Sequence, residues 1–152
     1  MTGPRALDAL PGEDAMYKTI LVPIDLTRPE TAEPMIEIAR RIGDKDVRIV
    51  LVNVVEVWPY VAEELEQPGE YLKKSRESAD EKLKAIAKAA GIKPDYEVRV
   101  GKAPHGILDV AEKQEVDLII IGSHKPALQD YLISSTAARV VRHAKCSVLV
   151  VR

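Results

Sequence analysis

Residues typical of a phosphate-binding loop stand between Ile119 and Ala137. An apolar run ends at Gly122, eleven residues follow without another glycine, and three hydroxyl side chains, Ser134 to Thr136, then open an Ala/Val-rich segment. A phosphate group needs convergent backbone N–H groups and a helix N-terminus, and glycine lets the backbone come close. The hydroxyls can also serve as plain helix caps, although three are more than a cap requires. This pattern predicts an anion site with less glycine than usual.

A carboxylate stands at a second position where chemistry is expected. Asp25 ends the apolar run "KTILVPID", which is typical of a strand buried on both faces. An acidic residue there can hydrogen-bond a ribose hydroxyl or share a cation with phosphates. It can equally cap the turn that follows. Both interpretations of Asp25 stay open at this point.

Signatures of several enzyme classes are missing. The only Gly-Lys pair, Gly101–Lys102, lacks the rest of a Walker A motif, and neither G-x-G-x-x-G nor G-x-S-x-G occurs where it would be needed. Cys146 precedes an apolar run and is expected to pack rather than react. No histidine has metal-ligand spacing with cysteines or carboxylates: His105, His124 and His143 are spread along the chain. We therefore expect no catalytic residue and no metal site.

Length and composition bound the class of protein. The chain has 152 residues, a net charge of −2, one cysteine and no phenylalanine. These values favour one domain with an aliphatic core, no intrachain disulfide and a reducing compartment, and give no reason to expect nucleic acid as partner. No apolar run approaches the roughly 18 residues of a membrane span, and the start lacks a secretory signal. We expect a cytoplasmic protein without membrane insertion, in which residues 1–16 form a loosely attached leader and residues 17–152 the domain.

Apolar runs alternate with helical periodicity along that domain. We expect strands over 18–25, 47–55, 95–100, 118–121 and 147–151, and helices over 31–42, 71–90, 103–114 and 135–143. Thr31 is the expected N-cap of the first helix, Gly43 its left-handed C′ residue, and residues 56–70 a loop. The alternation predicts a doubly wound five-stranded parallel sheet with helices on both faces. Such a sheet binds ligands at the carboxyl ends of its strands, after Asp25, at 52–55 and after Ile121.

Four stretches together resemble the universal stress protein family: "ILVPID", "VNVV", "GKAPHGIL" and "IIIGSHKPALQDYLISSTAARVVRHAKCSVLVVR". The resemblance runs from about Met16 to Arg152. It implies the strand order 3-2-1-4-5 and a homodimer formed through the last strand, Ser147–Val151, with a tetramer as the open alternative. It also implies ATP binding, with or without Mg²⁺, in members that keep the full glycine motif, and none in members that lack it.

The glycine motif is matched only in part. Gly122 holds its first glycine position, Lys125 the second and Ser134 the third, with Ser135 behind it. The short "SHKP" loop is similar to the F and G types of enteric bacteria. Serine at position 134 costs on the order of 1 kcal/mol if the position needs φ > 0, and blocks the phosphate if the phosphate lies against the α-carbon. Lys125, in contrast, supplies an anion contact.

The resemblance implies roles for individual residues. Asp25 would meet the ribose or phosphates, Val54 the adenine edge through its backbone, and Gly122 the ribose. The candidate nucleotide-binding residues are Pro23, Ile24, Asp25, Val54, Ile121, Gly122, His124, Lys125, Ser134, Ser135 and Thr136.

Three functions are weighed on these residues. The first is an ATP-binding homodimer that acts as a stress-response or regulatory module and holds ATP without a general base to turn it over; slow hydrolysis is compatible with it. The second is a member that has lost nucleotide binding and acts through protein–protein contacts, for which Trp58-Pro59-Tyr60 is the natural surface. The third, an adenylating or pyrophosphatase enzyme, is disfavoured because no glycine-rich loop follows the first strand.

Overall fold

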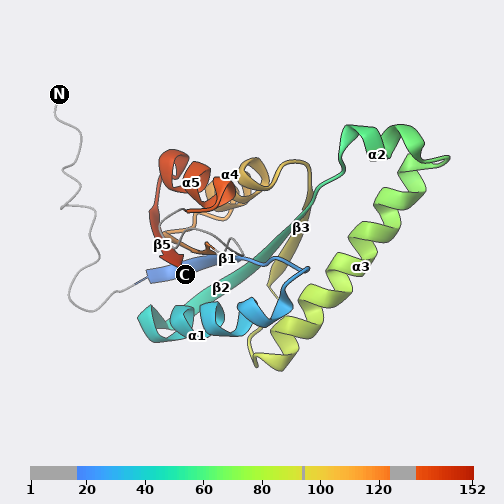
Figure 1. Cartoon of the computed structure of the whole chain (residues 1–152). Helices are drawn as coiled ribbons and strands as arrows, with labels where there is room; N and C mark the ends of the chain where they lie inside the picture. The colour runs from blue at the N-terminus through green and yellow to red at the C-terminus, as the bar shows by residue number, and fades with distance from the viewer. Residues whose placement is uncertain (1–16, 94, 124–132) are drawn as a thin grey trace.

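A single parallel sheet organises the chain. The computed structural model describes residues 17–93, 95–123 and 133–152, so the expected leader, His124 and Lys125 lie outside the described residues. The sheet has the order β3-β2-β1-β4-β5 with all neighbours parallel, which confirms the predicted fold. Its strands are β1 (Tyr17–Pro23), β2 (Gly43–Val55), β3 (Tyr96–Val100), β4 (Leu118–Gly122) and β5 (Ser147–Val151) (Figure 1).

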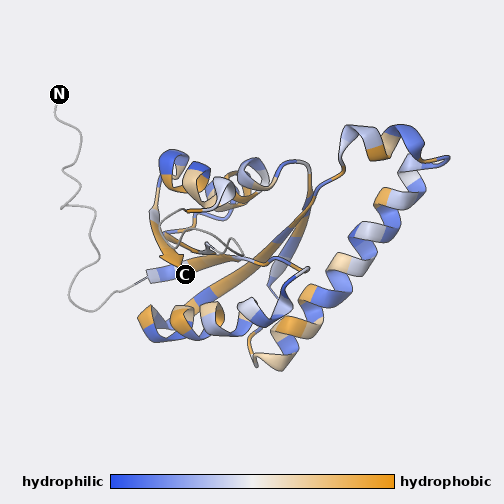
Figure 2. Ribbon diagram, in the orientation of Figure 1, coloured by the Kyte–Doolittle hydropathy of each residue, from blue (hydrophilic) through white to orange (hydrophobic). Residues whose placement is uncertain are grey.

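Helices cover both faces of this sheet, and each face has its own core. Alternation along β1 sends Ile20 and Val22 to one face and Leu21 to the other. The first face packs against α1 and α3, and the second against α4 and α5, as Figure 1 shows. In Figure 2 the apolar colour gathers on the strands between these layers. The helices are α1 (Ala32–Ile42), α2 (Pro59–Glu64), α3 (Pro68–Ala89), α4 (Ala103–Lys113) and α5 (Ser135–His143), with a 3₁₀ turn at Pro29–Thr31.

The end of α1 departs from the sequence prediction. Gly43 has φ −75° and ψ 162°, so it is the extended first residue of β2 and not a left-handed cap. A Cβ there would lie 2.5 Å from Cγ2 of Val47 and 2.8 Å from the Ala39 carbonyl oxygen. Glycine is therefore required by close approach rather than by a positive φ. After α3, in contrast, Gly91 is left-handed, with φ 66°.

The start of α1 also differs. Thr31 belongs to the 3₁₀ turn, and its hydroxyl donates to the Arg28 carbonyl at 2.8 Å. Thr31 stands at the predicted N-cap position, but its side chain makes no capping hydrogen bond to the helix. The turn already directs the chain into the helix, because it places Thr31 at αR angles before α1 begins.

Two helices occupy the region predicted as a loop. Pro59 starts α2 and Pro68 starts α3, both in first-turn positions where the missing N–H costs no hydrogen bond. α2 buries no residue, and α3 buries only Ala79, Leu83 and Ala87 in its second half. Figure 1 shows α2 and the first part of α3 reaching beyond the sheet. Over the described residues, no helix combines the length and apolarity needed to cross a membrane.

Candidate functional site

The carboxyl ends of β1, β2 and β4 open into a cleft of about 990 Å³. The first turns of α4 and α5 and one face of α3 complete its walls. Of the described candidate residues only Ser135, which is exposed, does not line it. The residues that do are Pro23, Ile24, Asp25, Val54, Ile121, Gly122, Ser134 and Thr136. The expected position of the site, at the ends of these strands, therefore coincides with a real cavity.

Asp25 serves the turn and still faces the cleft. Its Oδ1 accepts from the Thr27 N–H at 2.9 Å and from the Thr27 hydroxyl at 2.7 Å, which confirms the turn-capping interpretation. The structure gives Oδ2 no hydrogen-bond partner among the residues it describes. One carboxylate oxygen thus holds the turn, and the other remains available to a hydroxyl or a cation.

Asn53 positions the same turn from the neighbouring strand. Its Nδ2 donates to the Ile24 carbonyl at 2.9 Å, and the Ile24 N–H donates to the Val52 carbonyl at 2.7 Å. The side chain of Asn53 also lines the cleft. Asn53 is not among the residues predicted from the sequence. The signal that could have identified it is a lone amide side chain inside the apolar run of β2.

Ser134 caps α5 without backbone strain. Its φ of −56° lies outside the left-handed region, so the condition under which serine would cost about 1 kcal/mol here is not met. The hydroxyl accepts from the Ala137 N–H at 3.2 Å, as an N-cap does. The N–H groups of Ser135 and Thr136 have no partner inside the helix, because the first turn of any helix leaves them unsatisfied. With Thr136 lining the cleft, the positive end of α5 is presented to it.

Ser123 joins three elements behind this helix start. The buried Ser123 hydroxyl accepts from the Ser134 N–H at 3.0 Å, and the Ser123 N–H donates to the Val151 carbonyl at 2.7 Å. β4, β5 and the start of α5 therefore meet at one serine. Sequence analysis did not assign it a role, because its partner lies eleven residues away.

Gly122 leaves space on the cleft floor. A Cβ at this position would meet Met35 Sδ at 3.5 Å, an ordinary contact, and Met35 also lines the cleft. Neither its φ nor its surroundings therefore demand glycine in this structure.

Glu56 supplies the missing cap of α4. Its Oε1 accepts from the Ala103 N–H at 2.6 Å, whereas Lys102, at the N-cap position, makes no side-chain cap. Gly106 lets the same helix approach β2, since a Cβ would lie 2.8 Å from Val54 Cγ2. The acidic Glu56 thus occupies the α4 N-terminus, whereas the α5 N-terminus is capped by the neutral hydroxyl of Ser134. Of these two helix starts, that of α5 is the better suited to an anion.

Cys146 does not contribute a reactive thiol to this cleft. Burial, assisted by the Asp117 carboxylate, raises the pKa of the Cys146 thiol, which lowers the fraction of reactive thiolate at neutral pH. Cys146 also lies outside the cleft residues. Within the described ranges, no group of three or more His, Cys, Asp or Glu side chains is placed to hold a metal ion.

A parallel sheet of order 3-2-1-4-5 with helices on both faces and a cleft at its strand ends defines a doubly wound α/β protein. The chain belongs to the universal stress protein family, whose model matches residues 16–152. Universal stress protein MJ0531 of Methanocaldococcus jannaschii is 34% identical over 144 residues, covering 90% of this chain and 83% of that protein. Universal stress protein G of Escherichia coli O157:H7 is 30% identical over 145 residues, covering 90% and 100%, in agreement with the short-loop resemblance.

Solved structures share the fold. That of hypothetical protein MJ0577 has a TM-score of 0.70 and 28% identity, and the match covers 90% of this chain and 96% of that one. A universal stress protein in complex with cAMP has a TM-score of 0.57 at 20% identity, covering 91% and 98%. One from Archaeoglobus fulgidus in complex with dAMP has a TM-score of 0.55 at 19% identity, covering 90% and 99%. At these two lower identities the likeness concerns the fold alone.

Proposed function

We propose that this protein binds ATP in the cleft at the ends of β1, β2 and β4 and acts as a homodimeric stress-response or regulatory module. The observation that carries the proposal is that one cleft contains both unsatisfied hydrogen-bond donors and an unsatisfied carboxylate acceptor. The α5 N-terminus, with Thr136, offers N–H and hydroxyl donors to phosphate, and Oδ2 of Asp25 offers an acceptor to ribose. Two proteins of the same fold hold adenine nucleotides, which supports the choice of ligand class.

The fit of a nucleotide to these residues follows from their chemistry. An anion is stabilised at a helix N-terminus whose donors are unsatisfied. Asp25 is suited to a ribose hydroxyl or to a Mg²⁺ shared with phosphates. Val54 and Ile121 supply apolar walls for a base, and Gly122 leaves room on the floor. ATP is held rather than turned over in this proposal, because no described cleft residue forms a nucleophile–base pair.

Nucleotide that stays bound through purification is the first test of this function. The full chain is purified without added nucleotide and denatured, and the released small molecules are identified by chromatography and mass spectrometry. We expect an adenine nucleotide in the released fraction. An empty fraction, together with ATP affinity weaker than millimolar, contradicts the proposal.

The homodimer is proposed to form through β5. This strand lies at the edge of the sheet, and Leu149 on it is 37% exposed. An apolar edge strand invites pairing with a second copy of itself, because its outer N–H and C=O groups have no strand to pair with. Sedimentation equilibrium of the wild-type chain is expected to give a dimer mass. A monomer mass at every concentration up to the micromolar range contradicts this assembly.

A second candidate function, protein–protein contact without nucleotide, is favoured by one observation. Trp58 and Tyr60 are 59% and 63% exposed on a segment whose helix, α2, buries no residue. Exposed aromatic side chains of this size are typical of contact surfaces. The nucleotide measurement separates the two candidates, because only the first requires a ligand in the cleft.

A further inference from the structure

Between Tyr71 and Lys82, α3 presents a largely polar face to the cleft. Tyr71, Lys74, Ser75, Ser78 and Lys82 recur at helical spacing and all line the cavity. In a helix that covers a sheet, this face would ordinarily carry apolar residues that enter the core. Here the buried positions begin only at Ala79. The polar face therefore needs an explanation other than packing.

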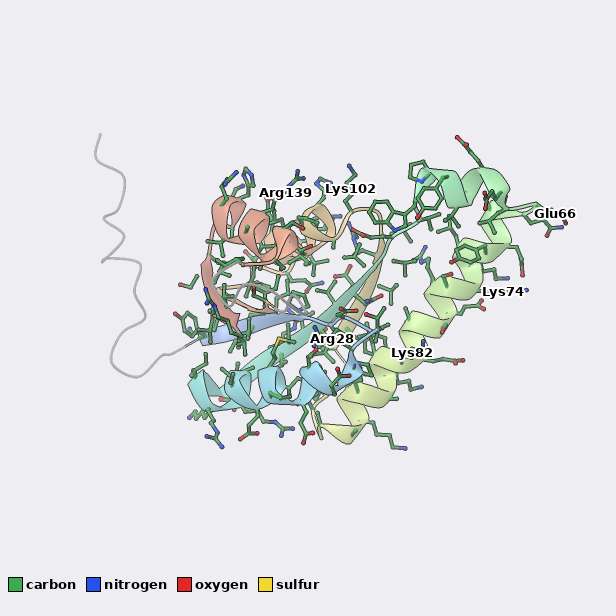
Figure 3. All side chains as sticks on the ribbon, viewed as in Figure 1. Arg28, Glu66, Lys74, Lys82, Lys102 and Arg139 are labelled. Atoms are coloured by element: carbon green, nitrogen blue, oxygen red, sulfur yellow. The ribbon has the colours of Figure 1, made fainter. Side chains whose placement is uncertain are left out.

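Positive charge dominates that side of the cleft. Arg28, Lys74 and Lys82 line it, and the two carboxylates in the described lining, Asp25 and Glu56, already accept hydrogen bonds from backbone N–H groups. Figure 3 labels Arg28 on the connection after β1 and two lysines on α3. In this view Lys82 lies nearer to Arg28, and Lys74 lies closer to the start of the helix.

The ion pairs made by these cations are weak. Arg28 Nε lies 3.8 Å from Oε1 of Glu30, whose side chain is 69% exposed. Lys74 Nζ lies 3.9 Å from Oε1 of Glu70. Lys82 makes no ion pair with any residue that the structure describes. Because solvent-exposed pairs at such distances contribute little, Arg28 and Lys74 can exchange them for a ligand anion, and Lys82 has no described ion pair to give up.

The cationic wall and the α5 N-terminus lie on opposite sides of the sheet. α3 covers one face and α5 the other, and the cleft runs over the strand ends between them. Its volume of about 990 Å³ is at the upper end of the range of roughly 300–1,000 Å³ found for small-molecule sites. A ligand that fills it therefore meets phosphate-binding groups at both of its ends.

We propose that Arg28, Ser78 and Lys82 form a second anion subsite, so that the cleft prefers adenine nucleotides whose phosphate groups reach both of its sides, the α5 N-terminus and the face of α3. This inference rests on the proposed function, because it assigns one phosphorylated end to the start of α5. Two kinds of ligand supply this chemistry and are called two-ended ligands below: a nucleotide with a 3′-phosphate apart from its 5′-phosphate, and a dinucleotide whose long phosphate chain joins two adenosines.

Calorimetric titration of paired charge-reversal variants tests the subsite. The full chain, Lys82→Glu and the matched control Lys84→Glu are titrated with AMP, ATP, adenosine 3′,5′-bisphosphate, diadenosine tetraphosphate and tripolyphosphate. Lys84 is exposed on the same helix and lies outside the cleft lining, so both variants change the net charge equally. We expect Lys82→Glu to weaken at least one of the two-ended ligands about tenfold and AMP by less than about twofold. Lys84→Glu should leave all of them within about twofold.

The ligands separate the ways in which this inference can fail. Equal effects of the two variants, or two-ended ligands that bind no tighter than AMP, overturn the subsite and leave nucleotide binding intact. If Lys82→Glu loses as much affinity for ATP as for the two-ended ligands, Lys82 binds the phosphates of ATP itself, and this result also overturns the second subsite.

Other outcomes concern the proposed function. If no nucleotide binds but tripolyphosphate binds through Lys82, the proposed function is contradicted and the anion subsite is supported. If nothing binds, both fall. Of the two-ended ligands, the one more weakened by Lys82→Glu identifies the source of the second phosphate.

Discussion

Replacing Asp25 with alanine is expected to weaken ATP binding by at least about tenfold. The side chain provides the cleft with a charged acceptor, and a hydrogen bond to a charged group contributes roughly 1.5–3 kcal/mol, or about 10- to 150-fold in affinity. The substitution also removes the acceptor of the Thr27 N–H and hydroxyl, which loosens the turn that carries Ile24 to Thr27 along the cleft. Isothermal titration of ATP into both proteins measures the difference.

The matched control, Asp25→Asn, separates the charge of this side chain from its role in the turn. The asparagine keeps one oxygen that can accept from Thr27, but its amide NH2 replaces the second carboxylate oxygen, so the charge and the free acceptor are lost while the turn is kept. We expect its ATP affinity to fall between those of the wild type and Asp25→Ala. Equal ATP affinity in all three proteins would show that Asp25 holds the turn and does not contact the nucleotide.

Replacing Ser123 with alanine is expected to lower the free energy of unfolding by about 1–2 kcal/mol. The hydroxyl of Ser123 is buried and accepts the Ser134 N–H at 3.0 Å, and its loss leaves that donor without its partner at the start of α5. A buried donor left unpaired costs roughly 1–3 kcal/mol. Urea denaturation followed by circular dichroism gives the two free energies of unfolding.

Ser135→Ala is the control for the Ser123 substitution. Ser135 is exposed on the same segment, and its removal should change the free energy of unfolding by less than about 0.5 kcal/mol. The proposed role of Ser123 is contradicted if the two alanine variants unfold at the same urea concentration with the same slope.

The layers of the fold could be predicted because short apolar runs alternate along the chain with segments of helical periodicity. Ile20, Leu21 and Val22 are completely buried, as a central strand requires. The order of the strands came from the resemblance to a family and not from this periodicity. Asp25, Val54 and Gly122 line one cleft, because a parallel sheet places the carboxyl ends of its strands at the same edge.

Local conformation near turns was harder to predict. A glycine after a helix is compatible with a left-handed cap and with close packing, and only the contacts of Gly43 with Val47 and Ala39 decide between them. Pro59 and Pro68 were interpreted as loop residues, although proline also begins helices. The backbone conformation of Ser134 was also open. A serine at this position could have replaced a left-handed glycine or served as a helix N-cap, and the structure shows the N-cap, with φ −56°.

Two residues that shape the site act through distant partners. Asn53 reaches the Ile24 carbonyl across 29 residues, and Ser123 reaches Ser134 across eleven. Periodicity and motif spacing describe neighbours along the chain, so contacts of this kind become visible only after folding. The polar face of α3 belongs to the same class, since its significance depends on the cleft that it faces.

ATP titration of the purified wild-type chain, with and without Mg²⁺, tests the central claim most directly. The proposed site predicts saturable binding with a dissociation constant below a millimolar, one site per chain, and a clear loss of affinity in Asp25→Ala. Binding weaker than millimolar, with no adenine nucleotide released from the purified protein, would contradict nucleotide binding and favour a protein that acts through its exposed aromatic surface.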